Sequence, residues 1–243
     1  MSLFCGGFNA SNQLGCISDK KLPYKMDVPL DNIKYLTNGE DHTLLIYNNG
    51  SVYALGDDED FTIGTPNRTT YLSPEKIDNI ISNENITFVH CGSFYSSYLT
   101  ESGKIIICSL KRKGEPITFA SVNPLIHISG CGRSPLAIDS KGSIYIFKED
   151  PSEEPEYISS FDKPIYDITQ TDAMIACVDI DGCAYGNGIL NKGNHEFAKI
   201  DALNGKKIRQ ISSSEIHAFF VTDDNNAFIF GDLYNEEMDD IKF

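Results

Sequence analysis

Apolar and polar positions follow one pattern that recurs five times along the chain without a gap inside the pattern. Each copy is 24 residues long, and the first reads IKYLTNGEDHTLLIYNNGSVYALG. The copies occupy residues 33–56, 86–109, 125–148, 165–188 and 208–231. The first, fourth and fourteenth positions are aliphatic in every copy. Such fixed apolar positions indicate that each copy forms the same small unit and buries its apolar side chains against its neighbours.

The eighteenth position of the pattern predicts a tight turn. It holds Gly50, Gly103, Gly142, Gly182 and Asn225. Gly and Asn adopt a positive φ at little cost, and here they separate two runs rich in β-forming residues. Each copy is therefore predicted to form strand, loop, strand, turn and strand, with little helix anywhere. We expect each closing strand to pair antiparallel with the strand before the turn. The closing strands span residues 52–55, 105–108, 144–147, 183–186 and 227–230.

Strand-rich repeats of about 40 to 50 residues predict an all-β fold, namely one β-propeller domain over residues 1–243, with a solenoid as the alternative. The predicted ring has five blades, or six as the alternative. Residues 3–5 resemble a closing strand, so we expect them to join the sheet built from residues 208–230 and to close the ring. A homodimer closed through the same strand is the alternative to this monomer. The Pro-containing stretches 26–30 and 72–77 are predicted edge strands.

Composition narrows the class of protein. Hydrophobic residues make up 41% of the 243 residues, which is typical of a packed globule and excludes a mostly disordered chain. The formal net charge of -15 repels phosphate backbones, so nucleic acid is not an expected partner. Seven Cys stand at no metal-like spacing, as in a reducing compartment, and no apolar stretch reaches membrane-spanning length. We therefore expect a cytoplasmic protein without membrane contact, with the nucleus as the alternative location.

Two short motifs connect these repeats with a known family. The connector from Gly7 to Gly15 reads GFNASNQLG, which matches Gly-x-Asn-x-x-x-Gln-Leu-Gly, and Gly39 and His42 form a Gly-x-x-His turn. The chain thus resembles the regulator of chromosome condensation repeats over essentially its whole length. The resemblance implies a β-propeller, in that family of about seven blades, and guanine-nucleotide exchange on a small GTPase together with docking to nucleosomes. This sequence departs from the family in having five countable copies and no Trp.

Two histidines, His42 and His217, occupy the same position of the pattern. Both lie near acidic residues, as a catalytic base often does. Their recurrence at one repeat position favours a structural role, a hydrogen bond between neighbouring repeats. Structural roles are also predicted for the repeated glycines Gly39, Gly50, Gly92, Gly103, Gly142 and Gly182. His90, His127 and His195 have no partner at metal-ligand spacing, so no catalytic, metal or cofactor site is predicted.

Acidic residues concentrate in the connectors between the repeats. The candidate partner-binding residues are Asp57, Asp58, Glu59, Asp60, Glu149, Asp150, Glu153, Glu154 and Glu156. A solvated loop without a ligand is the alternative interpretation of these runs. The connector 148–157 is also Pro-rich and needs no defined conformation. Asp179 and Asp181 begin a sequence like that of a calcium loop, but the later bidentate Glu is missing and Gly182 is already explained by the turn.

These features predict a non-catalytic scaffold that presents variable acidic connectors to a protein partner. The partner is expected to be basic or of mixed charge, and no cofactor is expected. A regulator or exchange factor of a small GTPase is the alternative, and it follows from the family resemblance alone. An enzyme with its site at the centre of the ring is a further alternative.

Overall fold

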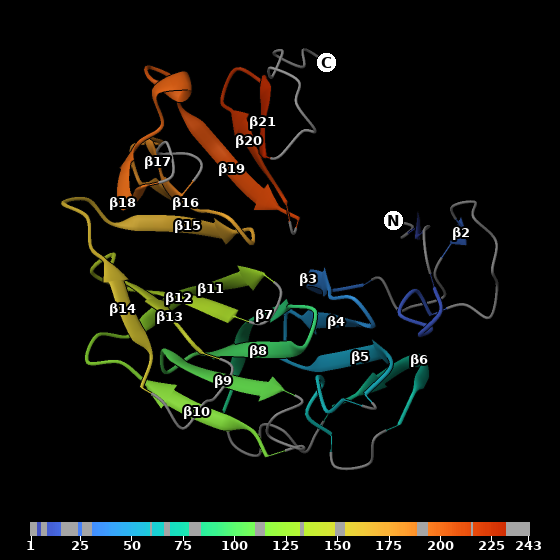
Figure 1. Ribbon diagram of the computed structural model, residues 1–243. Helices are drawn as coiled ribbons and strands as arrows, with labels where there is room; N and C mark the ends of the chain where they lie inside the picture. The colour runs from blue at the N-terminus through green and yellow to red at the C-terminus, as the bar shows by residue number, and fades with distance from the viewer. Residues whose placement is uncertain are drawn as a thin grey trace.

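The computed structural model describes residues 4–5, 9–15, 24–25, 31–58, 60–65, 69–77, 84–109, 115–131, 134–148, 154–188, 194–214 and 216–231. Over these residues the protein is all-β, with one short 3-10 helix, η3 (Asp201–Leu203), and no α-helix. Five of the six sheets are arranged as blades around a common centre (Figure 1). The prediction of a five-bladed β-propeller is therefore confirmed.

Each blade is an antiparallel sheet whose strands follow the order of the chain. Blade 1 contains β3 (Ile33–Asn38), β4 (His42–Tyr47), β5 (Val52–Gly56) and β6 (Tyr71–Lys76). Blade 2 contains β7 (Ile86–Cys91), β8 (Tyr95–Thr100), β9 (Lys104–Ser109) and β10 (Ile117–Ala120). Blade 3 contains β11 (Leu125–Cys131), β12 (Ser134–Asp139), β13 (Ile144–Ile146) and β14 (Glu156–Ser159).

The last two blades continue this order. Blade 4 contains β15 (Ile165–Gln170), β16 (Ile175–Asp179), β17 (Ala184–Gly188) and β18 (Asn194–Lys199). Blade 5 contains the three described strands β19 (Ile208–Ser213), β20 (His217–Thr222) and β21 (Ala227–Gly231). In every blade the third strand pairs antiparallel with the second, as predicted for the closing strands. The first strands β3, β7, β11, β15 and β19 contact one another in succession around the centre.

The turn between the second and third strands has the left-handed backbone that the sequence predicts. The φ angles are +79°, +77°, +83°, +82° and +63° for Gly50, Gly103, Gly142, Gly182 and Asn225, respectively. In each turn this residue donates its backbone N–H to the carbonyl three residues earlier, as Gly142 does to Asp139 at 2.9 Å. The tight hairpin explains why this position holds Gly or Asn in every repeat.

A β-bulge occurs at the second position of the first strand in all five blades. In β3 the ladder shifts between Ile33 and Tyr35, and β7, β11, β15 and β19 shift at the same place. A regular strand alternates its side chains, which would put the first and fourth positions on opposite faces of the sheet. The extra residue of the bulge brings both onto one face. The bulge therefore explains why two aliphatic positions stand three residues apart in each repeat.

The hydrophobic core consists of layers that lie between consecutive blades. Between blades 1 and 2, Leu44 and Ile46 share a cluster with Ile86 and Val89, and all four side chains are at most 3% exposed. The other blade pairs repeat this arrangement with the residues at the same repeat positions. Burial of apolar surface contributes roughly 25 cal/mol per Å², so these layers are the main source of stability.

The N-terminal strand corrects one prediction. β1 (Phe4–Cys5) pairs with β2 (Tyr24–Lys25) in a two-stranded sheet and not with β21. Figure 1 shows this pair well separated from β21. Cys5 packs with Leu45 and Leu55 of blade 1 instead. The predicted closure of the ring on residues 208–230 is therefore wrong for the described part of this strand.

Hydrogen bonds from the first connector explain why β1 stays at blade 1. The Gln13 side chain donates to the Glu40 carbonyl at 3.0 Å, and the Thr43 hydroxyl donates to the Gln13 carbonyl at 2.7 Å. The Cys5 thiol itself donates to the Leu14 carbonyl at 3.4 Å, which holds β1 beside this connector. The first blade thus holds the strand that was predicted to reach the last blade.

The outer strands settle two further predictions. The edge strand predicted at residues 72–77 is confirmed as β6, shifted by one residue. In the connector 148–157, for which the sequence required no defined conformation, Glu156 begins β14 and pairs with Ile146. Residue 3 and the predicted edge strand 26–30 lie outside the described residues.

Candidate functional site

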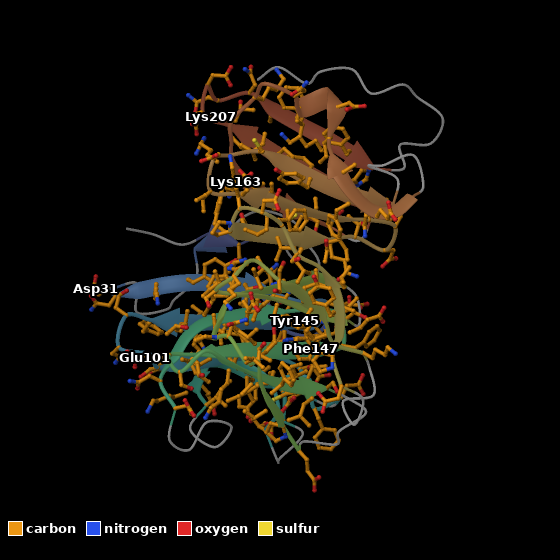
Figure 2. All side chains as sticks on the ribbon, turned by 90° about the vertical axis from the view of Figure 1, so that its left-hand side faces the viewer. Asp31, Glu101, Tyr145, Phe147, Lys163 and Lys207 are labelled. Atoms are coloured by element: carbon orange, nitrogen blue, oxygen red, sulfur yellow. The ribbon has the colours of Figure 1, made fainter. Side chains whose placement is uncertain are left out.

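Two faces of the ring follow from the antiparallel order of the strands. The loops between first and second strands emerge on the same side as the connectors, and we name this side the connector face. Its described residues are 9–15, 39–41, 57–58, 60–65, 69–70, 92–94, 115–116, 147–148, 154–155, 171–174, 214 and 216. The hairpin turns and the links to the next blade form the opposite side, the turn face. Asp31, Glu101, Lys163 and Lys207 of the turn face lie along one edge of the molecule in Figure 2.

The described residues of the two faces differ in charge. Among the described residues of the connector face, Lys148 is the single basic residue. The acidic residues of that face are Glu40, Asp41, Asp57, Asp58, Asp60, Glu115, Glu154 and Asp172. The described turn face carries charges of both signs, and Lys163 there pairs with Asp181. Charges of one sign raise a potential that attracts the opposite charge, so the described part of the connector face favours a positively charged partner.

Asp58 corrects part of the predicted acidic loop, because its side chain is fully buried. Its carboxylate accepts backbone hydrogen bonds from Ile63 at 2.8 Å and Thr65 at 3.0 Å, and it also accepts one from the Thr65 hydroxyl. Burial raises the pKa of Asp58, and these hydrogen bonds lower it in part. Asn9 organises the first connector in the same way through the Leu14 N–H at 2.8 Å. Asp58 therefore shapes its connector and cannot contact a partner.

The remaining predicted acidic residues divide into two groups. Asp60, Glu154 and Glu156 are exposed and Asp57 is half-buried, so all four are accessible on or next to the connector face. Glu59, Glu149, Asp150 and Glu153 lie outside the described residues. Glu40, which the sequence did not single out, is exposed in the loop after β3. The accessible acidic surface therefore comes from loops of more than one blade.

His42 forms the interblade hydrogen bond that the repeat pattern predicts. Its side chain is fully buried, and Nε2 lies 2.8 Å from the Ser96 hydroxyl of blade 2. Burial, with a smaller contribution from His90, lowers the pKa of His42 to about 4. His42 is therefore neutral and inaccessible at pH 7. His217 is half-buried in blade 5, and its ring lies 6.5 Å from that of Phe219.

Gly39 and Gly92 share the seventh position of the pattern, next to the loop after the first strand. A Cβ on Gly39 would lie 2.3 Å from the Gly92 carbonyl oxygen of the next blade. A Cβ on Gly92 would lie 2.1 Å from the Tyr95 ring. Neither distance is possible for a real Cβ, so these glycines allow the close approach of chain segments where the innermost strands end.

A central channel lies between the five first strands. It has a volume of about 890 Å³ and is lined by all five first strands, with Gly39 and Glu40 at its connector-face end. The third repeat position contributes a side chain from every blade, namely Tyr35, Phe88, His127, Asp167 and Gln210. The Tyr35 and Phe88 rings lie 4.4 Å apart, and the Phe88 and His127 rings 5.0 Å apart. His127 Nε2 in turn lies 3.3 Å from Asp167 Oδ1. Four blades thus form a continuous arc of aromatic and polar groups.

The chemistry of the channel wall is acidic and aromatic. Among its described lining residues, Glu40 and Asp167 carry carboxylates and none is Lys or Arg. His90 contacts the Gly130 carbonyl through Nε2 at 3.2 Å, and burial lowers the pKa of His90 to about 4. No three His, Cys, Asp or Glu side chains gather for a metal ion anywhere in the described ranges. The channel therefore has the composition of a site for a cation that carries its own apolar or planar surface.

Asp179 has a structural role in its hairpin. Its Oδ1 accepts the backbone N–H groups of Asp181 and Cys183, and its Oδ2 accepts the Tyr185 hydroxyl at 3.1 Å. Asp139 and Tyr145 repeat these contacts one blade earlier. The predicted calcium-like sequence is thus explained by hydrogen bonds within the turn.

The buried cysteines among the described residues do not have activated thiols. Cys91, Cys108 and Cys177 are buried in the interblade layers, and burial raises the pKa of each thiol. A raised pKa keeps the thiol protonated and weakly nucleophilic at pH 7.

In the described chain no helix combines the length and the apolar composition that crossing a membrane requires.

The third repeat position was not predicted as a site from the sequence. Tyr, Phe, His, Asp and Gln share no chemical type there, so the position does not stand out as a column. The available signal was the spacing of the aliphatic positions one and four, since a bulge between them turns position three toward the other face. Position three can therefore be located from the pattern even though its residues vary.

Comparison with known proteins places the fold. No family model matches the chain. The mouse serine/threonine-protein kinase Nek9 is 27% identical over 108 residues, which cover 41% of this chain and 11% of the kinase. Human WBSCR16 is similar in structure, with a TM-score of 0.77 and 17% identity over 94% of this chain and 70% of that chain.

Yeast RCC1 (Prp20), in its structure with Kap60, is similar with a TM-score of 0.80 and 14% identity, covering 95% of this chain and 64% of that chain. A second structure, Prp20p from Saccharomyces cerevisiae, is described with its binding properties to Gsp1p and histones; its TM-score is 0.75 at 15% identity, over 95% and 67% of the two chains. The chain thus spans about a tenth of Nek9 and about two thirds of the solved propellers. The fold is an RCC1-type β-propeller, as the repeat motifs predict.

Proposed function

We propose that this protein is a non-catalytic scaffold that binds a basic protein partner through its connector face. The observation that carries the proposal is the difference in charge between the described residues of the two faces of the ring. Accessible carboxylates such as Glu40, Asp60 and Glu154 occupy the connector face, where the described residues include one Lys and no Arg. Interblade layers and interblade hydrogen bonds hold these loops on a rigid support, which reduces the entropy lost on binding.

The positions that repeat support this division of roles. His42, Gly39 and the turn glycines are occupied by packing and hydrogen bonds within the ring. The connectors vary in length and sequence. Conserved architecture with variable surface loops is the usual arrangement of a binding module.

The test compares two variants with the same change in charge. The connector-face variant combines Glu40→Gln, Asp57→Asn, Asp60→Asn and Glu154→Gln. The turn-face control combines Asp31→Asn, Asp162→Asn, Asp201→Asn and Asp223→Asn, all at exposed residues. A partner is first isolated by affinity capture from cell extract, and its Kd is then measured with each purified variant.

We expect the connector-face variant to weaken binding at least about tenfold, which corresponds to about 1.4 kcal/mol, and the control to change it less than about threefold. A high-salt buffer should reduce the difference, because it screens exposed charges. Equal effects of the two variants, or no protein captured at all, would contradict the proposal.

A regulator of a small GTPase is the second candidate function. Its support is the fold, which this chain shares with yeast Prp20p, a protein described with its binding to Gsp1p. A nucleotide-release assay with a panel of purified small GTPases tests it directly. Acceleration of release by the wild-type chain, lost in the connector-face variant, would favour this candidate. Release rates that do not change with any GTPase would exclude exchange activity on that panel.

A further inference from the structure

We propose that the central channel is a binding site for an arginine side chain, delivered by a basic segment that enters from the connector face. This inference rests on the proposed function, since it names the chemistry of the partner and the place where one of its side chains ends. Its basis is the arc formed by Tyr35, Phe88, His127 and Asp167 along the channel wall.

Charge selects the sign of the ligand. The lining residues of the channel in the described chain include two carboxylates, Glu40 and Asp167, and no Lys or Arg. The whole chain has a formal net charge of -15, so the field outside the channel acts in the same direction. A cleft lined by one sign of charge concentrates counter-charges and raises their rate of association. Phosphates and carboxylates are therefore repelled, and cations are drawn in.

Aromatic rings select a planar cation. Tyr35 and Tyr166 line the channel from different blades and are 39% and 37% exposed, respectively, although both belong to innermost strands. Partly exposed tyrosines in a concave site offer ring surface to a ligand, and guanidinium groups stack on aromatic rings more readily than ammonium groups. An arginine side chain is thus a better fit than lysine to this wall.

Asp167 provides a carboxylate oxygen for the guanidinium. Its contacts with the His127 ring and with the Ile168 N–H are both made through Oδ1. Oδ2 is therefore the oxygen that can accept hydrogen bonds from a ligand. Tyr35 lies close enough across the channel for the charge of Asp167 to raise its pKa, after the larger effect of burial.

The size of the channel fits a short segment and not an isolated ion. Its volume of about 890 Å³ falls in the range of about 300–1,000 Å³ that is usual for ligand sites. Gly39, Glu40 and Ser93, in loops after the first strands, line the channel at its connector-face end, so the channel and the connector face share residues. One surface and one channel would then recognise the same basic partner.

The experiment uses the full chain and an acetylated, amidated peptide of sequence Gly-Arg-Gly-Arg-Gly, titrated calorimetrically in about 0.15 M salt, where the Debye length is about 8 Å. Matched peptides carry Lys or the neutral analogue citrulline in place of Arg. The variants are Asp167→Asn, which keeps an oxygen acceptor, and Tyr35→Leu, at a partly solvated side chain. Asp162→Asn on the turn face is the control for loss of one charge.

We expect saturable binding of the Arg peptide, weakened at least about fivefold by Asp167→Asn and about threefold by Tyr35→Leu, and changed less than twofold by Asp162→Asn. The citrulline peptide should bind at least about tenfold more weakly than the Arg peptide, and the Lys peptide about threefold more weakly. Unchanged melting temperatures show that both channel variants fold.

Two results would overturn the inference. One is equal weakening by Asp167→Asn and Asp162→Asn, which indicates adhesion to an acidic surface. The other is no saturable binding by the wild-type chain up to about 1 mM peptide. Failure of the channel proposal can be distinguished from failure of the proposed function. If the Kd of a captured partner responds to the connector-face variant but not to Asp167→Asn or Tyr35→Leu, the proposed function stands. The channel is then not part of the binding site.

Discussion

His42 and His217 occupy the same position of the repeat but have different surroundings. His42 lies in blade 1, where it is fully buried and its ring contacts Ser96 of blade 2. His217 lies in blade 5, which no further described blade follows, and its half-buried ring lies near Phe219. The same residue is therefore an interblade link in one blade and a partly solvated side chain in the other. A residue at a given repeat position forms an interblade contact only where the next blade supplies the partner residue.

The valines at the fourteenth position show the same difference. Val178 in blade 4 is fully buried against blade 5, whereas Val221 in blade 5 is half-buried. In a repeat protein each unit is stabilised mainly by its neighbours. Blade 5 has such a layer with blade 4 and no described blade on its other side. We therefore expect blade 5 to open more readily than the inner blades.

The largest expected effect concerns the pH dependence that the buried His42 confers. The folded protein holds the pKa of His42 at about 4, below the usual value of 6.5. The unfolded chain consequently binds more protons between these pH values, so the free energy of unfolding falls as the pH drops through this window. For a shift of this size the loss is roughly 2 kcal/mol at pH 5 and roughly 3 kcal/mol by pH 4.

Urea unfolding of the wild type and of His42→Asn at pH 7 and pH 5 measures this effect. The variant should be less stable than the wild type at pH 7, and its loss of stability on going to pH 5 should be smaller by roughly 2 kcal/mol. Val178→Ala, which weakens the core without removing a histidine, should keep the wild-type pH dependence. Parallel pH profiles for the wild type and His42→Asn would show that His42 is not the group responsible.

The second expected effect compares Val178 with Val221 directly. Val178→Ala removes two methyl groups from a closed interblade layer and should destabilise the protein by roughly 2 to 3 kcal/mol. Val221→Ala removes the same atoms from a half-solvated position and should cost roughly 1 kcal/mol or less. Chemical denaturation gives both values. A cost for Val221→Ala that equals the cost for Val178→Ala would mean that blade 5 is covered as completely as blade 4.

The repeat pattern predicted most of the fold because each of its fixed positions has one physical role. Aliphatic residues at positions one, four and fourteen fill the interblade layers, and Gly or Asn at position eighteen forms the hairpin turn. The path of β1 was not predictable in this way. A strand of two residues, Phe4–Cys5, carries no alternation from which to choose a partner, and the hydrogen bonds of Gln13 that hold it near blade 1 are made by a loop.

The candidate site was less predictable than the fold. Asp58 belongs to an acidic run that has the composition of a solvated loop, and its burial depends on backbone N–H groups up to seven residues later. The channel residues Tyr35, Phe88 and Asp167 come from three blades, and their repeat position does not hold one chemical type in all five copies. Only the bulge in each first strand, together with closure of the blades around a centre, brings them to one wall. The acidic net charge was predictable from composition. The surface on which the accessible carboxylates lie could be located only from the fold.

The last comparison concerns substitutions at the turn position of an inner blade and of the last blade. Gly142 has a φ of +83°, and a Cβ there would lie 3.2 Å from the Ile165 backbone nitrogen. Gly142→Val forces a β-branched side chain into the left-handed region and should destabilise by roughly 1 to 3 kcal/mol. Asn225 has a φ of +63° at the same position of blade 5. Asn225→Gly relieves the backbone but removes the contact of its side chain with Arg209, made at 3.2 Å.

These two effects of Asn225→Gly oppose each other, so its net change should stay within about 0.5 kcal/mol. The pair of variants tests whether the turn position has the same role in both blades, independently of the cover on blade 5. Thermal unfolding with Gly142→Ala as an intermediate should rank the costs as Val above Ala above the Asn225→Gly change, since Ala meets the φ penalty without the branched side chain. An unchanged melting temperature for Gly142→Val would refute the hairpin assignment, because valine at a positive φ is strained and has to lower the stability of the folded protein.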